Sequence, residues 1–216
     1  MATYLDLKTA VTGQLGGLDG ATYVAKRETC INRARRRYYN EKKWTYLKED
    51  DATLTFSNQV ASLPTDFNKR YDPLDIYFYT GNIKYAFNKT NWGNIASYLT
   101  DQYVYAVSKK NGQVKINHGE ITTLTMEYLY LPADYTATDG SQDTSVEPAS
   151  DITAITALSI GYWWLSKERD FEKFQAFEQE YLAQLALDKA ADLMDEPVRF
   201  FRPARPYIIR GYVSKY

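Results

Sequence analysis

Hydrophobic positions near the N-terminus recur every three or four residues, which is the spacing of an amphipathic helix. Thr3 can cap a short first helix, and a glycine-rich stretch over residues 13–20 ends it. A second helix is expected over about Thr22–Leu47. The apolar stripes of these two helices are Tyr4, Leu7, Val11 and Leu15, and then Val24, Ile31, Ala34 and Tyr38.

The same helical spacing returns after residue 150. Ser150 or Asp151 can cap this region, and a break near residues 167–170 divides the pattern, which then continues to about Leu193. The apolar positions are Ile152, Ile155, Leu158, Tyr162 and Leu165 before the break, and Phe171, Phe174, Phe177, Tyr181 and Leu185 after it. The chain is therefore expected to be helical at both ends.

Between these helices, residues 50–135 alternate between apolar and polar positions, which is typical of β-strands. Gly81-Asn82 and Asn111-Gly112 each separate two such runs and are strong signals for β-hairpins. Six or seven short strands at this spacing predict a small antiparallel sandwich or barrel. The predicted strands lie near residues 52–56, 60–64, 74–79, 83–87, 103–107, 114–116 and 121–131.

Together these patterns predict an α+β chain in which an antiparallel β unit is inserted into a helical bundle. The bundle is formed by residues 1–49 and 150–196, the inserted β-sandwich or barrel-like unit by residues 50–135, and a polar linker by residues 136–149. Residues 197–216 differ from all of these. They contain three prolines, which exclude a continuous helix, and we expect an extended C-terminal arm.

Composition narrows the classes of function. The single cysteine, Cys30, and the single histidine, His118, cannot form a multi-cysteine or two-histidine metal site or a familiar catalytic set. We therefore expect no enzyme activity, no cofactor and no metal. No apolar run approaches 18 residues and no signal peptide is recognisable, so we expect neither secretion nor a membrane partner. The aromatic content of 15% favours either a β-rich fold or surfaces that become covered in a complex.

Charge nearly cancels over the whole chain, with 26 Lys+Arg against 27 Asp+Glu, but it is unevenly distributed. Residues 26–48 are strongly basic, and residues 168–196 are acidic. The basic helix has three interpretations: a solvated face packed against acidic neighbours, a nucleic-acid or phosphate surface, or a protein interface. The candidate residues for a subunit interface or a DNA-channel face are Arg33, Arg35, Arg36, Arg37, Lys42 and Lys43.

The C-terminal arm is basic and aromatic and contains no acidic residue, unlike a typical disordered tail. It can fold back onto its own domain or dock into a groove on another chain, where Arg and aromatic side chains make strong anchors. Because ordering an extended segment costs entropy, we expect the arm to be loose in the free protein. The candidate docking residues are Arg199, Phe200, Phe201, Arg202, Arg205, Tyr207, Ile208, Ile209, Arg210, Tyr212 and Tyr216.

Several short segments occur in a recognisable order along the chain. They are Arg35-Arg-Arg-Tyr-Tyr39, Trp44-Thr-Tyr-Leu47, Ala52-Thr-Leu-Thr-Phe56, Leu63-Pro-Thr-Asp-Phe67, Leu131-Pro-Ala-Asp-Tyr135, Pro148 with the helix over 152–164, a Phe/Tyr-rich helix and the basic arm. Over nearly the whole chain, this layout resembles the head-to-tail adaptor (connector, or tail-tubular) proteins of tailed bacteriophages.

The resemblance implies a structural virion protein of the neck, between the capsid portal and the tail, that is present in the host cytoplasm during assembly. It further implies that copies of the chain form a ring, commonly of twelve, and that the arm docks on the portal protein. In such proteins the β part can extend toward the tail or nozzle protein, and passing DNA would be contacted without sequence specificity. The alternatives are another tail-completion or terminator component, and a nucleic-acid-binding module that uses residues 26–48.

Overall fold

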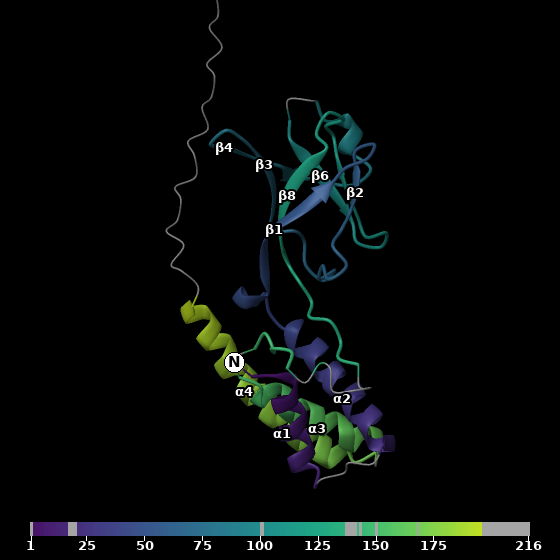
Figure 1. Ribbon diagram of the computed structural model, residues 1–216, viewed down its shortest axis with the longest axis vertical. Helices are drawn as coiled ribbons and strands as arrows, with labels where there is room; N and C mark the ends of the chain where they lie inside the picture. The colour runs from purple at the N-terminus through teal and green to yellow at the C-terminus, as the bar shows by residue number, and fades with distance from the viewer. Residues whose placement is uncertain are drawn as a thin grey trace, which may run out of the picture.

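Four helices lie at one end of the molecule and the strands lie at the other, along its longest axis (Figure 1). This computed structural model describes residues 2–16, 21–99, 102–136, 142, 144–149, 151–167 and 169–195. The prediction of an α+β chain is confirmed, whereas the pairing of a helix bundle with a β-sandwich and the domain boundaries stay predictions. The predicted arm, residues 197–216, lies outside the described residues.

The helices share one apolar cluster, to which each of them contributes buried side chains. The predicted cap at Thr3 is confirmed, because Thr3 and Asp6 exchange hydrogen bonds in a capping box at the start of the first helix. The third helix is central: ten of its fifteen residues are buried, and it packs against the other three. The helices are α1 (Tyr4–Gln14), α2 (Ala21–Tyr39), α3 (Thr153–Lys167) and α4 (Phe171–Asp195).

The second helix ends earlier than predicted: α2 stops at Tyr39, and only a short 3₁₀ turn over Thr45–Leu47 follows it. The cause is a tertiary contact. Trp44 stacks on Tyr38 with ring centroids 4.8 Å apart, and its indole N–H donates to the Tyr38 carbonyl oxygen over 3.1 Å. The chain must turn after α2 to make this contact, so the prediction of one helix to Leu47 was wrong.

The break predicted between the last two helices is confirmed. Arg169 adopts a positive φ of 53°, and the Asp170 carboxylate accepts a hydrogen bond from the Lys173 backbone N–H at the start of α4. The two helices approach each other closely at Gly161, where an added Cβ would lie 3.3 Å from atoms of Phe174 and Phe177. A side chain at position 161 would therefore require Phe174 or Phe177 to shift.

We expect Gly161→Leu to lower the free energy of unfolding by about 1–3 kcal/mol, because the larger side chain would force α3 and α4 apart. Urea unfolding measures this change. Gly13→Leu is the matched control, because Gly13 also lies in a helix and a Cβ added there would meet no atom within 4 Å. Equal effects of the two substitutions would contradict the close approach at Gly161.

The strands form two four-stranded sheets, ordered β1-β8-β3-β4 and β2-β7-β6-β5. Buried side chains of both sheets belong to one apolar cluster, which includes Leu54, Ile76, Val114, Ile116 and Met126. The strands are β1 (Lys48–Thr55), β2 (Val60–Ser62), β3 (Asp75–Thr80), β4 (Ile83–Ala86), β5 (Asn88–Lys89), β6 (Val104–Ser108), β7 (Gln113–Ile116) and β8 (Thr123–Leu129).

Both predicted hairpins are present. β3 pairs with β4 across Gly81, and β6 pairs with β7 across Gly112; both glycines have a positive φ, of 58° and 63°. One departure from the predicted antiparallel pattern is β5, a two-residue strand absent from the sequence-based assignment, which pairs parallel to β6. Its shortness explains the omission, because two residues contain no alternation to detect.

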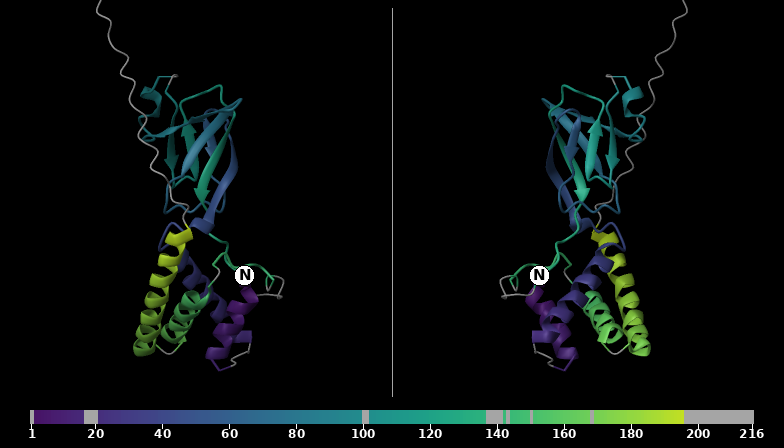
Figure 2. Two further views of the ribbon diagram at one scale, coloured as in Figure 1. Left: turned by 90° about the vertical axis from the view of Figure 1, so that its left-hand side faces the viewer. Right: turned by 90° about the vertical axis from the view of Figure 1, so that its right-hand side faces the viewer.

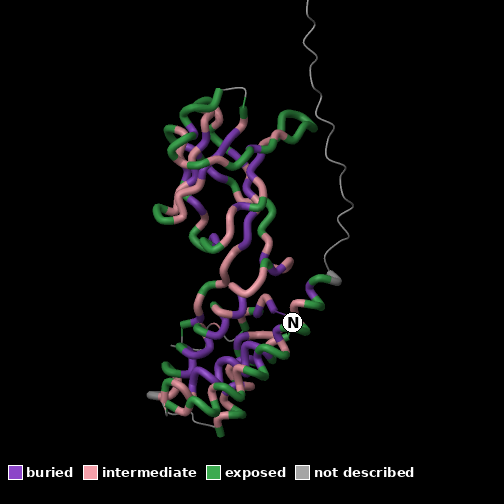
Figure 3. The backbone as a smooth tube through the Cα atoms, turned by 180° about the vertical axis from the view of Figure 1, so that it is seen from behind, coloured by how far each residue is buried: buried purple, intermediate pink, exposed green. Residues whose placement is uncertain are grey.

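The two parts are joined by two chain crossings and by a buried asparagine. Residue 47 runs directly into β1, and β8 returns the chain to the helices (Figure 2). Asn68 is buried, and its amide donates to the Asn40 side-chain oxygen just beyond α2 over 3.1 Å. In Figure 3 the buried residues form one group among the helices and one among the strands. The C-terminal end of α4 lies beside the lower end of the β part (Figure 2).

Candidate interaction surfaces

Arg33 and Arg37 face α3 and α4. The Arg33 guanidinium lies 4.1 Å from the centre of the Tyr162 ring, while Arg37 pairs with Glu178 over 2.7 Å. Arg37 also lies 5.1 Å from the Tyr181 ring centre. The basic helix is therefore partly neutralised by the acidic C-terminal helix of the same chain.

Arg35 is buried, with only 2% of its surface exposed. Its Nε donates to both carboxylate oxygens of Glu147, over 3.0 and 3.1 Å, and its guanidinium stacks 4.0 Å from the Tyr135 ring centre. The hydroxyls of Tyr39 and Tyr135 also donate to the Glu147 carboxylate. Arg35 is thus an internal residue in this chain and presents no charge to its surface, unlike the predicted interface or channel residue.

The remaining three basic candidates point in different directions. Arg36 forms an exposed pair with Asp134, Lys42 pairs with Asp192 on α4, and Lys43 lies 5.7 Å from the Tyr71 ring centre. The six candidate residues therefore do not gather into one continuous basic face. Counting basic residues in the sequence identifies the positive charges, but it does not identify the carboxylates and rings that they contact.

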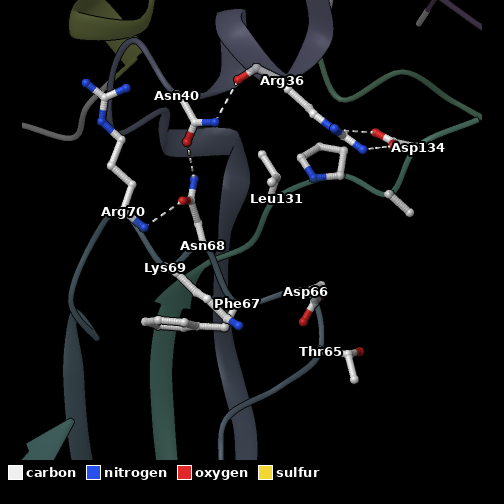
Figure 4. Close-up of a pocket in the computed structure, with 12 residues that line it drawn as sticks. Arg36, Asn40, Thr65, Asp66, Phe67, Asn68, Lys69, Arg70, Leu131 and Asp134 are labelled. Atoms are coloured by element: carbon white, nitrogen blue, oxygen red, sulfur yellow. Dashed lines mark hydrogen bonds and ion pairs between the residues drawn. The ribbon is translucent and has the colours of Figure 1, made fainter. Parts of the chain in front are cut away.

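A cavity of about 660 Å³ lies where the helical and β parts meet (Figure 4). Arg36 and Asp134 form one wall, and a chain of hydrogen bonds links the Arg36 carbonyl, the Asn40 amide, the Asn68 amide and the Arg70 backbone N–H. Basic and acidic side chains are mixed around it. Its lining comes from both the helical part and the β part of the fold.

α4 carries an apolar face that the described part of the chain leaves uncovered. Leu182, Leu187 and Leu193 are 49%, 64% and 60% exposed, although they belong to a well-formed helix. Residues three or four apart share a helix face, so exposed alanines extend the same surface. The apolar residues of this face are Leu182, Ala183, Ala186, Leu187, Ala190, Ala191 and Leu193. Small and apolar side chains of this kind allow close packing against another protein surface.

The two residues that sequence analysis set aside have structural roles. Cys30 is buried with its Sγ 3.8 Å from the Ser166 hydroxyl, and burial raises the pKa of its thiol. His118 stacks on Tyr103 with ring centroids 4.6 Å apart. Within the described residues, no group of His, Cys, Asp and Glu side chains has the arrangement of a metal site. None of the described helices is both long and apolar enough to span a membrane.

The family assignment comes from a family model described as the SU10 adaptor protein, which matches residues 2–206. The chain belongs to this family. The SU10 adaptor family match includes the helices, the whole β part and the first ten residues of the arm, and it confirms the resemblance to phage adaptors. Membership indicates a phage adaptor, which is a structural component of the virion. A comparison with curated proteins finds no match.

Proposed function

We propose that this SU10 adaptor family member forms a ring in the virion neck, docks on the portal protein and connects the capsid to the tail. The family match over residues 2–206 carries this proposal. The copy number we propose is twelve. The ring would surround a channel through which DNA passes, and it would contact this DNA without sequence specificity. The β part would face the tail or nozzle protein.

The composition of the segment after α4 supports docking by the C-terminal arm. Residues 197–216 combine aromatic side chains with five Lys/Arg and no acid, which suits a long extended contact with another chain. We therefore propose residues Arg199–Tyr216 as the portal-docking segment.

The exposed apolar face of α4 supports ring formation. Exposed leucines on one helix face lose contact with water when a second copy packs there, and such burial favours association. The basic side chains of α2 support a nucleic-acid-binding module less well, because Arg35, Arg37 and Lys42 already pair with carboxylates of the same chain. A protein assembly therefore fits the surface better than a dedicated DNA-binding protein.

Deletion of residues 197–216 is expected to abolish binding to the portal ring encoded by the same genome, while the described fold remains intact. Native mass spectrometry of the full chain mixed with the portal measures the discrete mass increment and counts the copies. Replacing the arm with a Gly/Ser segment of equal length is the matched control and should also bind no portal.

Two results would contradict the proposal. A well-folded full chain that adds no mass to the portal would favour a tail-completion or terminator component instead. Portal binding that survives both arm variants would place the docking surface elsewhere on the chain. Thermal unfolding of each variant, followed by circular dichroism, verifies that the helices and sheets are retained.

A further inference from the structure

A second cavity, of about 280 Å³, lies beside the C-terminal half of α4, and we call it the α4 groove. Three aromatic rings form one side: Tyr38 stacks on Trp44 at 4.8 Å, and Trp44 stacks on Tyr46 at 5.6 Å. Leu187 and Ala191, both exposed, contribute apolar surface from α4. The Tyr38 and Trp44 rings are only 2% and 1% exposed, so the accessible apolar surface of the groove comes from Leu187, Ala191 and the partly exposed Tyr46.

The α4 groove is acidic. Asp188 accepts hydrogen bonds from the Tyr38 hydroxyl over 2.9 Å and from the Gln184 amide over 3.0 Å, and the same amide donates to Asp151 over 3.2 Å. Burial raises the pKa of Asp188, and the nearby charge of Asp151 raises it further. Lys42 neutralises Asp192, but no described Lys or Arg forms an ion pair with Asp151 or Asp188. Two carboxylates in this groove thus lack a cationic partner among the described residues.

We propose that the α4 groove holds the beginning of the chain's own C-terminal segment, with the Arg199 guanidinium directed toward Asp188 and Asp151. A guanidinium suits the site because it pairs with carboxylates, and its flat face can pack on the partly exposed ring of Tyr46. The segment that begins at Pro197 contains arginines and no acidic residue, so it has no carboxylate that the acidic groove would repel. Its first basic and aromatic residues are Arg199, Phe200, Phe201 and Arg202.

The tether is short enough to favour the chain's own segment over another occupant. Asp192 lines the groove, and α4 ends three residues later at Asp195. Asp188 lies about 10 Å back along the helix from Asp195, and the four residues from there to Arg199 span up to about 13 Å when extended. A tethered segment of this length has an effective concentration in the millimolar range, well above that of a free partner.

Occupation of the α4 groove has a regulatory consequence that rests on the proposed function. If residues 197–216 dock on the portal, the groove competes for the first part of that segment until the portal is met. The groove would then keep the apolar and basic side chains of the arm from associating before assembly. The occupancy itself is measurable on the isolated full chain and does not depend on portal binding.

Limited trypsin digestion of the full chain measures the occupancy. Trypsin cleaves after Arg199 and Arg210, whereas Pro203 and Pro206 block cleavage after Arg202 and Arg205. When a segment opens and closes rapidly, the cleavage rate follows the population of the open form. The ratio of cleavage at Arg199 to cleavage at Arg210, quantified by mass spectrometry, therefore reports release of the segment from the groove.

Two variants are expected to raise this ratio at least about tenfold, a change of about 1.4 kcal/mol. The first variant, Asp151→Asn combined with Asp188→Asn, removes the carboxylate charges of the groove. Its control is Glu172→Gln combined with Glu180→Gln, because both of these residues are exposed on α4 outside the groove. Ala191→Arg places a competing cation in the groove, and Ala190→Arg adds the same charge on the adjacent exposed position that does not line it.

A ratio that stays within twofold of the native value in both groove variants would overturn the proposal. Protection of Arg199 that grows with protein concentration would overturn it as well, because the groove would then hold the segment of a neighbouring copy. Circular dichroism verifies that every variant is folded. Loss of portal binding in the native chain would contradict the proposed function alone and would leave the protease result unchanged.

Discussion

Replacing Glu147 with alanine is expected to lower the free energy of unfolding by about 3–5 kcal/mol, the typical cost of leaving a buried charge without its partner. The Glu147 and Arg35 side chains are 0% and 3% exposed, and they pair through the Arg35 Nε. Removing the carboxylate would strand the guanidinium and two tyrosine hydroxyls, those of Tyr39 and Tyr135, inside the helical part.

Asp134→Ala is the matched control for this experiment. It removes the partner of Arg36, the next residue of α2, but that pair is largely exposed and is expected to contribute only about 0–1 kcal/mol. Denaturant unfolding of both variants gives the two values. Equal losses in the free energy of unfolding would show that burial does not determine how much the Arg35–Glu147 pair contributes to stability. Replacing Arg35 and Glu147 together by methionine should recover part of the loss, since no buried charge is then left unpaired.

This cluster also explains how the ends of the chain are joined. The segment that carries Glu147 meets the N-terminus: Val146 pairs with Thr3, and the Glu147 backbone N–H donates to the Ala2 carbonyl over 2.9 Å. The Glu147→Ala variant should therefore loosen α1 as well as the segment before α3. Hydrogen exchange of the α1 amides would detect that loosening.

Local patterns were sufficient to predict much of the fold. The capping box at Thr3, the hairpins at Gly81 and Gly112 and the break before Asp170 all depend on residues close together in the sequence. Such features are governed by backbone sterics and short-range hydrogen bonds, which act in the same way in every chain. The apolar stripes likewise identified most of the buried hydrophobic side chains of the helices, including Leu7, Val11, Ile31 and Tyr38.

Long-range partners could not be predicted in this way. Glu147 lies in a polar stretch that reads as a solvated linker, yet its side chain is completely buried because Arg35, 112 residues away, folds onto it. The partners of the basic residues of α2 could not be predicted either. The number of basic residues predicts a charged surface, but it does not indicate which carboxylates pair with them. The α4 groove was missed because Asp151, Asp188 and the aromatic rings come from separate parts of the chain.

Placing two charges in the apolar face of α4 is expected to abolish assembly on the portal while leaving the chain folded. Leu182→Glu combined with Ala186→Glu substitutes two exposed positions one helical turn apart, neither of which lines the α4 groove. Burying unpaired carboxylates between neighbouring copies is unfavourable, so we expect the association of neighbouring copies to weaken at least about 100-fold, or about 2.7 kcal/mol.

Gln175→Glu with Gln179→Glu is the control, because it adds the same charge to exposed polar positions earlier on α4. The number of copies on each portal particle, measured by native mass spectrometry, separates the outcomes. A complete ring in the Leu182/Ala186 variant would show that neighbouring copies meet through another surface. Single copies that bind the portal through the arm without forming a ring would instead show that arm docking and contact between copies are independent. Such a result is possible because the substituted face lies on α4, whereas the docking residues lie beyond it.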